Sequence, residues 1–248
     1  MPRTKYSKEY LKNHFFYSRW VYLVVVLVAL GAAEITFTVT RYQAPNARRV
    51  DIELVGGYAD LSNTKEAEAA LLAAGQAYER SRDEANGVDT SASDYEVPLQ
   101  EVGLYNINYT GKVTDNDDYY AGQKYMVMLA AQEGDIYIVT REMLENLVND
   151  CGLAPLDPFI ESGLLSTEGV DLDDVTFDEA PYNEGDEPSG NRYVYALPAD
   201  RLVGLARNYS YPVSGRYIVI MTYSQNQDTA AAVIRELFTL YGEEVRAE

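Results

Sequence analysis

Carboxylates are the most abundant side chains with possible chemistry in this 248-residue sequence, and they are densest in TEGVDLDDVTFDEAPYNEGDEPSGN (167–191). Clustered carboxylates can supply the oxygen ligands that calcium prefers. In TDNDDYY (114–120), the sixth position counted from Asp115 is Tyr120, where the twelve-residue calcium loop needs glycine. Gly and Pro residues in the longer segment favour a solvated loop or hairpin. We therefore predict no bound metal and no cofactor, with calcium as the alternative.

Histidine and cysteine each occur once. His14 lies in the N-terminal leader, so the rest of the chain has no imidazole for a catalytic triad, a proton shuttle or a zinc site. Cys151 cannot form an internal disulfide, and apolar neighbours favour a buried free thiol. Carboxylate-pair hydrolysis stays chemically open, but no spacing marks a particular pair. We expect a protein that is not an enzyme.

An apolar run from Trp20, WVYLVVVLVALGAA, continues past Glu34 as ITFTV and is long enough to cross a bilayer as a helix. The leader at 1–19 carries five basic residues and one acidic residue, a net +4, which favours a cytoplasmic N-terminus. The sequence thus predicts a single-pass protein of the cell membrane, with a transmembrane helix at 20–38 and an extracellular C-terminal domain. A cleaved signal peptide is the alternative, because small residues follow the run at 31–33.

The chain beyond the leader is strongly acidic. Subtracting the leader's +4 from the formal net charge of −19 leaves −23 for the residues after position 19. Such a surface repels nucleic acid and anionic lipid headgroups at range. We expect no nucleic-acid partner.

Three strands, each followed by a helix, organise the outer domain. Short runs that are β-branched or alternate in polarity predict strands at 50–60, 102–109 and 135–139. Asn63 and Glu66 have the spacing of a capping box for the first helix. Such units in series predict a mostly parallel sheet flanked by helices, an α/β lobe at 50–248 behind a linker at 39–49.

Later elements follow the same logic. The helix before the third strand reads as mostly core, with Tyr125, Met126, Met128, Leu129 and Ala130. Thr140 suits the N-cap of the next helix. After an acidic excursion at 166–190, YVYAL (193–197) and GRYIVIMTY (215–223) predict a hairpin, and a last helix is expected at 227–241.

A ligand crevice in an open α/β sheet lies outside the carboxyl ends of the strands. That edge would offer Tyr58, Asp60, Asn108, Thr140 and Arg141. Arg141 can hold a carboxylate or sugar hydroxyls, and Tyr58 can stack on a ring. The alternatives are a solvated first-turn residue for Arg141 and simple turn chemistry for Tyr58 and Asp60.

Residues 123–157, QKYMVMLAAQEGDIYIVTREMLENLVNDCGLAPLD, resemble a segment of the extracellular solute-binding proteins of ABC importers. The matching pieces are Ala130-Ala131 ending a helix, Gly134-Asp135 before a strand, and Gly152 to Asp157 at the exit. The C-terminal YIVIMTYSQNQDTAAAVIRELFTLY is similar to the last strand and helix of that family's first lobe. The resemblance implies a periplasmic-binding-protein-like lobe that works with a transporter.

The chain departs from that family in two ways. It is too short for a second lobe, and Cys151 cannot serve as a lipid-modified cysteine after the leader. Arg19-Trp20, FTVT (37–40) and VDIELVG (50–56) also resemble pieces of uncharacterised single-pass membrane proteins of Gram-positive bacteria.

A small ligand on one lobe would stay half exposed, which limits its affinity. We therefore expect a membrane-anchored module that docks a transporter or envelope protein. The alternative is a receptor lobe that captures a sugar, peptide or amino acid for an ABC importer.

Overall fold

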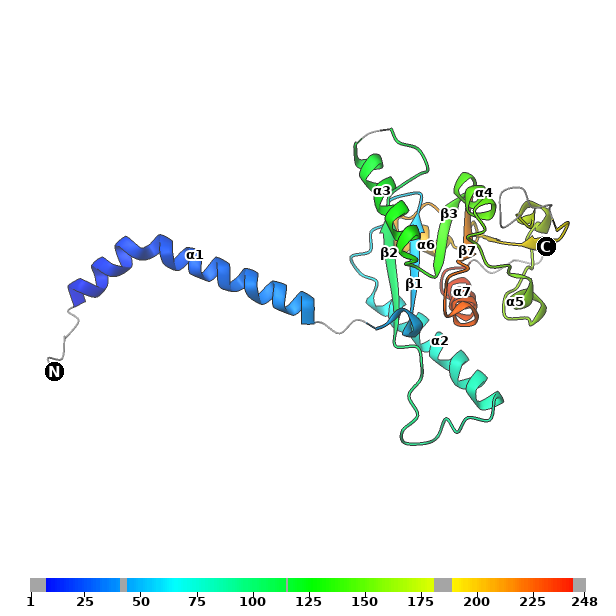
Figure 1. Cartoon of the computed structure of the whole chain (residues 1–248), viewed down its shortest axis with the longest axis horizontal. Coiled ribbons are helices and arrows are strands. Elements are labelled where there is room, and N and C mark those ends of the chain that lie inside the picture. The colour runs from blue at the N-terminus through cyan, green and yellow to red at the C-terminus, as the bar shows by residue number, and fades with distance from the viewer. Residues whose placement is uncertain (1–7, 41–43, 115, 181–188, 243–248) are drawn as a thin grey trace. The chain divides into compact units, whose positions relative to one another are not determined.

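The computed structural model describes residues 8–40, 44–114, 116–180 and 189–242 (Figure 1). Two compact units make up the chain, Met1–Gln43 and Ala44–Glu248. Residues 1–7 of the predicted leader, 41–43 of the linker and 181–188 of the acidic excursion lie outside the described residues.

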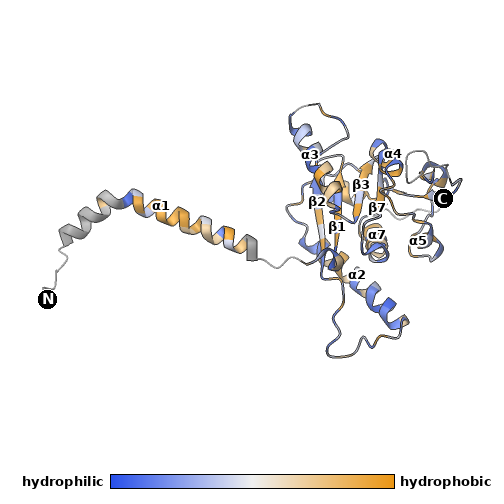
Figure 2. Ribbon diagram, viewed as in Figure 1, coloured by the Kyte–Doolittle hydropathy of each residue, from blue (hydrophilic) through white to orange (hydrophobic). Residues whose placement is uncertain are grey.

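Helix α1 (Lys8–Thr40) dominates the first unit. Its stretch Arg19–Phe37 is long enough and apolar enough to cross a membrane, and every side chain of this stretch is exposed. Figure 2 shows the apolar colour over most of this stretch of α1. A helix this long and this apolar is compatible with a single-pass membrane protein, and a signal sequence near an N-terminus has the same features.

The second unit is built on a five-stranded sheet in the order β2-β1-β3-β7-β6. The strands are β1 (Arg49–Val55), β2 (Glu101–Ile107), β3 (Ile136–Thr140), β6 (Leu197–Pro198) and β7 (Arg216–Ile220). Strands β1, β2 and β3 are parallel, whereas β7 runs antiparallel to both β3 and β6. The three predicted strands and the α/β class with a mostly parallel sheet are confirmed.

Helices cover both faces of this sheet. From β1 the chain crosses to β2 through α2 (Lys65–Ala85), and from β2 it crosses back over β1 to β3 through α3 (Asn116–Ala131). Right-handed crossovers in opposite directions place their helices on opposite faces. The last helix, α7 (Gln227–Tyr241), packs on α2, whereas α4 (Arg141–Asn149) packs on β3 and β7 beside α3.

The contact between α2 and α7 is close. An added Cβ at Gly75 of α2 would lie 3.4 Å from the side chains of Thr229 and Val233 of α7. The Thr229 hydroxyl donates to the buried carboxylate of Glu79 at 3.0 Å. The same carboxylate accepts from the backbone N–H of Leu99 at 2.6 Å, which ties the loop before β2 to both helices.

Smaller elements complete the second unit. They are η1 (Asn46–Arg48), α5 (Asp157–Glu161), η2 (Leu172–Asp174), β4 (Thr176–Asp178), β5 (Arg192–Val194) and α6 (Val203–Tyr209). Strands β4 and β5 pair antiparallel as a separate two-stranded sheet. The described part of the acidic excursion thus begins a hairpin, one of the two forms that its composition favours.

Three local expectations are wrong. The predicted strand 193–197 is split between two sheets, because β5 pairs with β4 while Leu197 and Pro198 pair with β7. Thr64, not Asn63, is the N-cap of α2, and its hydroxyl bonds to Glu68 at 2.9 Å.

Helix α3 is also less buried than its composition indicated. Only Gly122 and Tyr125 of α3 are buried, while Met126 and Ala130 are exposed. The reason is that α3 packs on β2, an edge strand, so only a narrow stripe of the helix meets the core.

Candidate functional site

The crevice predicted for a ligand lies between β1 and β3, where the strand order reverses. The protein's own Tyr211 fills it. Its side chain is fully buried, and its hydroxyl lies 2.6 Å from the carbonyl oxygen of Val55 and 3.2 Å from that of Ile138. Tyr211 therefore occupies the place that a ligand takes in an open sheet of this kind.

Pro212 and Arg216 continue this obstruction around the turn after β1. The Arg216 guanidinium donates to the carbonyl oxygen of Gly56, whose φ of +91° glycine adopts without strain. An added Cβ at Gly57 would lie 2.4 Å from Cγ of Pro212, so only glycine permits this approach. We call Tyr211, Pro212 and Arg216 the edge plug.

Asn106 of β2 fixes the same turn from the other side. Its Nδ2 donates to the carbonyl oxygens of Leu54 and Gly57 at 2.8 Å each, and its Oδ1 accepts from the N–H of Ala59 at 3.3 Å. The side-chain amide thus provides hydrogen-bond partners for backbone groups at the end of β1. Asn108, the predicted site residue, is exposed just beyond the end of β2.

The other predicted site residues lie in different surroundings. Tyr58 is 61% exposed in the turn after β1. Asp60 lines a cavity beside α2. Thr140 is the N-cap of α4 as predicted, since its hydroxyl oxygen accepts from the N–H of Met143 at 3.4 Å.

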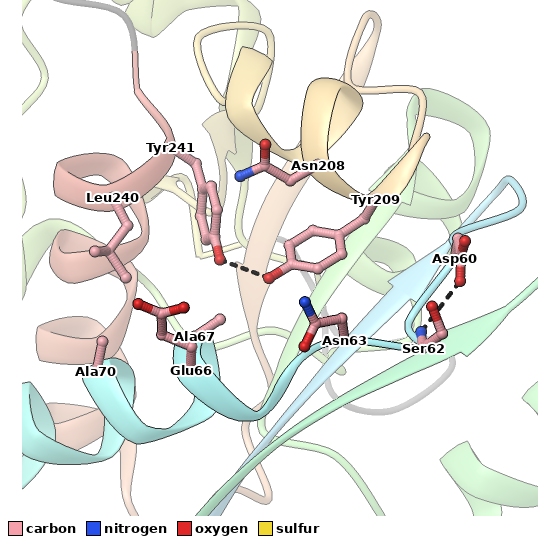
Figure 3. A pocket seen from close by; sticks show the side chains of 10 residues that line it. All are labelled: Asp60, Ser62, Asn63, Glu66, Ala67, Ala70, Asn208, Tyr209, Leu240 and Tyr241. Atoms are coloured by element: carbon pink, nitrogen blue, oxygen red, sulfur yellow. Dashed lines mark hydrogen bonds between the residues drawn. The ribbon is translucent and has the colours of Figure 1, made fainter.

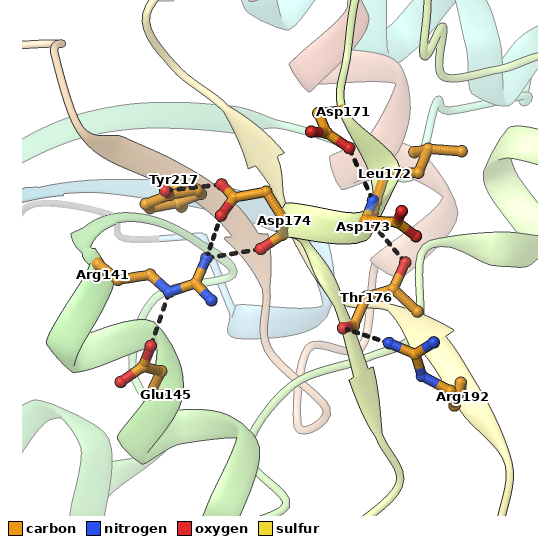
Figure 4. A network of polar contacts seen from close by, with 9 residues as sticks. All are labelled: Arg141, Glu145, Asp171, Leu172, Asp173, Asp174, Thr176, Arg192 and Tyr217. Carbon is orange, nitrogen blue, oxygen red and sulfur yellow. Dashed lines mark hydrogen bonds and ion pairs between the residues drawn. The ribbon is translucent and has the colours of Figure 1, made fainter.

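Arg141 is held by protein groups rather than presented to an empty crevice (Figure 4). Its Nε lies 2.7 Å from a carboxylate oxygen of Glu145, and its Nη1 lies 2.5 Å from the carbonyl oxygen and 3.0 Å from the carboxylate of Asp174. The guanidinium also stacks on the rings of Phe177 and Tyr217, with 5.0 and 5.6 Å to their centroids.

This network fastens the acidic excursion to the main sheet. The hydrogen bond to Glu145 is the main cause of a raised Arg141 pKa. The Tyr217 hydroxyl donates to the other carboxylate oxygen of Asp174 at 2.9 Å, so η2 is tied to both α4 and β7. A ligand at Arg141 would have to compete with these partners.

The cavity that Asp60 lines has a volume of about 570 Å³ (Figure 3). Its walls come from the loop after β1, the start of α2, and the ends of α6 and α7. The Tyr209 and Tyr241 hydroxyls lie 2.9 Å apart on its wall, and Asn63, Glu66 and Asn208 contribute further polar groups.

A groove of about 300 Å³ separates α3 from α4 on the other face of the sheet. Tyr125, Leu129, Met143 and Leu147 form its apolar part. Glu142, Asn146, Asn149 and Asp150 contribute polar side chains, and none of the described lining residues is basic. Met126, which is 63% exposed, lines the groove on the α3 side.

Three buried carboxyl groups lie at the β1 and β3 strands: Asp51, Glu53 and Asp135. Glu53 lies beside Tyr137 of β3 in the sheet register, and the Tyr137 ring contacts Tyr125 of α3. Glu53 therefore faces the α3 side of the sheet. Burial raises the pKa of Glu53 to about 8 and that of Asp51 to about 6. One carboxyl oxygen of each has no hydrogen-bond partner in the described chain.

The third carboxyl group is better satisfied. Asp135 accepts from the N–H of Asp51 at 2.9 Å and from the Ser224 hydroxyl at 2.6 Å. Arg49 lies 2.8 Å from the Asp51 carboxylate. Within the described ranges, no three Asp, Glu, His or Cys side chains are grouped to hold a metal ion.

No protein-family model matches this chain, and no curated protein sequence is significantly similar to it.

Proposed function

We propose that this protein is a membrane-anchored docking module whose contact surface comprises the α3–α4 groove and the exposed apolar side of α3. The observation that carries the proposal is the outer side of α3, where large apolar residues are left in solvent. They are Tyr119, Tyr120, Met126 and Val127, which are 50%, 66%, 63% and 65% exposed. Large apolar side chains gathered in solvent on one helix are typical of protein interaction sites.

The spacing of these residues makes them one surface. Positions 119, 120, 126 and 127 are separated by about two turns of the helix, so they lie along one side of α3. Met126 also lines the groove, which continues the apolar surface inward to Met143. Methionine side chains are flexible and polarizable, and they suit a surface that adapts to a partner.

The charge around the groove defines the partner's chemistry. Glu142 and Asp150 are exposed at its lining, and no basic residue is among the described lining residues. An amphipathic helix with an apolar face and flanking Lys or Arg residues matches both the apolar floor and these carboxylates. The partner segment we propose is such a basic helix in a transporter or envelope protein.

The edge plug supports docking over solute capture. Capture of a sugar, peptide or amino acid in the crevice between β1 and β3 would require displacement of Tyr211, which is fully buried. By contrast, the α3–α4 groove is open without rearrangement. The candidate span Arg19–Phe37 would anchor the module, with the basic leader on the cytoplasmic side and the acidic domain outside.

A peptide titration tests this proposal. The full chain in detergent is titrated into a fluorescent synthetic helix with leucines on one face and lysines on the other, and anisotropy is measured. We expect saturable binding that weakens as salt is raised. A helix with the same leucines and a glutamate face is the charge control and should bind much more weakly.

Paired variants locate the site. The double substitution Met126→Gln with Val127→Gln removes apolar contact from α3 without adding charge, and should weaken binding about tenfold or more. Val88→Gln changes another exposed apolar residue, 47% exposed after α2, and should leave affinity unchanged. Equal affinity for all three proteins would contradict docking at α3.

A further inference from the structure

The 570 Å³ cavity beside Asp60 belongs to neither the edge plug nor the α3–α4 groove. It lies among α2, α6 and α7, the helices of the opposite face from α3. Its volume falls within the range of about 300–1,000 Å³ that small-molecule sites occupy. We name it the α2–α6–α7 cavity.

Close contacts between backbone segments hold its walls. The N–H of Asp60 donates to the carbonyl oxygen of Tyr209 at 2.7 Å, which ties the loop after β1 to the end of α6. An added Cβ at Gly204 would lie 2.8 Å from Cα of Tyr241, so α6 and α7 meet almost backbone to backbone. The cavity is therefore formed before any ligand arrives.

Tyr209 and Tyr241 leave one hydroxyl hydrogen for a ligand. The two residues are only 6% and 7% exposed, and their rings pack edge to face at 5.8 Å. Their hydroxyls share one hydrogen bond, which uses one of two hydroxyl hydrogens. Among the described residues no acceptor is recorded for the second hydrogen, and Figure 3 shows both hydroxyls on the cavity wall. Burial raises the pKa of Tyr241, so the hydroxyl of Tyr241 stays protonated at neutral pH.

The other polar groups restrict the ligand's charge. Among the described residues of the lining, only Asp60 and Glu66 are charged, and both are negative, so phosphates and carboxylates are repelled. The amides of Asn63 and Asn208 offer both donors and acceptors. A ligand that matches this set has hydroxyl groups, which can accept from the tyrosine pair and donate to the carboxylates.

An amine is the competing ligand class. An ammonium group would satisfy Asp60 and Glu66, but it has only donors and leaves the tyrosine hydrogen without an acceptor. Tyr209, Tyr241 and Leu240 add apolar surface suited to the C–H face of a sugar ring. We propose that the α2–α6–α7 cavity binds a neutral polyhydroxylated ligand of mono- or disaccharide size.

Ligand-observed NMR on the full chain in detergent tests the proposal. The probes are neutral hexoses and disaccharides, spermidine as the cation, and glucose 6-phosphate as the anion. We expect saturation transfer to at least one neutral sugar and none to the phosphate. Binding of spermidine alone, or no transfer to any neutral sugar, would overturn the proposal.

Two variants assign the signal to the cavity. The double variant Tyr209→Phe with Tyr241→Phe keeps both rings and removes both hydroxyls, and should weaken sugar binding by tenfold or more. Asn208→Ala, at an exposed position, is the second test and should weaken it several-fold with little effect on folding. The α3 double variant is the matched control and should bind sugar normally, which separates this site from the docking surface. Sugar binding that survives both cavity variants would place the site elsewhere.

Discussion

The hydroxyl of Tyr211 lies 2.6 Å from the carbonyl oxygen of Val55, a residue 156 positions earlier in the chain. This contact closes the point between β1 and β3 at which an open α/β sheet leaves a crevice. Tyr211, in the segment between α6 and β7, thus occupies the position where a ligand would otherwise lie. The two surfaces for which we propose functions lie elsewhere, on α3 with α4 and among α2, α6 and α7.

Tyr211→Phe should destabilise the protein because two buried carbonyl oxygens, of Val55 and Ile138, lose the hydroxyl. We expect a loss of about 2 kcal/mol in the free energy of unfolding. That corresponds to a fall of roughly 4–8 °C in the thermal midpoint. Tyr217→Phe is the control, because its bond to Asp174 is exposed, and should shift the midpoint much less. Equal shifts would show that the edge plug contributes no special stability.

The buried carboxyl groups make stability depend on pH. The pKa of Glu53 is raised by burial and then by Asp51, from 4.5 to about 8 in the folded protein. Between these values the folded state holds a proton that the unfolded state has lost, so stability falls as pH rises through this window and levels off above it. Asp51 acts in the same direction between 3.8 and about 6. Thermal midpoints should rise as pH is lowered from about 9 to about 5.

Glu53→Gln tests the origin of this slope. A glutamine keeps the shape of the protonated acid but cannot ionise, so the variant should be more stable than the parent above pH 8, by about 5 kcal/mol at most. Near pH 5 the two proteins should have similar midpoints. Glu142→Gln, at an exposed position, should leave the parent's slope intact. A variant that keeps the parent's pH dependence would rule out Glu53 as its source.

Arg141→Ala should loosen the acidic excursion. The guanidinium is the common partner of Glu145, Asp174 and the Phe177 ring, so its removal frees η2 and β4 from α4. Because the side chain is more than a third exposed, we expect a loss of only about 1 kcal/mol. Hydrogen exchange should become faster at 172–178, whereas Arg48→Ala, which breaks an exposed pair with Glu96 outside this network, should change it little.

Local sequence signals specified the main elements well. Gln227 to Tyr241 was predicted with the bounds that α7 has, and Thr140 is the predicted cap of α4. Both depend on side chains within a few residues of each other. The parallel order of β1, β2 and β3 followed from the alternation of strands and helices.

The candidate sites were predicted only in part. Asp60 lines a cavity, but its partners Tyr209 and Tyr241 are distant in sequence, and no local pattern links them. The role of Arg216 could not be predicted either, because its contact with Gly56 joins residues that are distant in the sequence. The exposure of Met126 could have been predicted from the sequence. Residues 125–131 are apolar without a break, although a helix on an edge strand can bury only one stripe.

Hydrogen exchange of the full chain with and without the lysine-faced helix tests docking at α3 and α4 most directly. Docking in the groove predicts slower exchange at 119–131 and 142–150, with no change in α2 or α7. The same peptide should protect neither segment in the Met126→Gln, Val127→Gln protein. Protection confined to α2 and α7, or no protection under conditions where the peptide is bound, would contradict the proposed function.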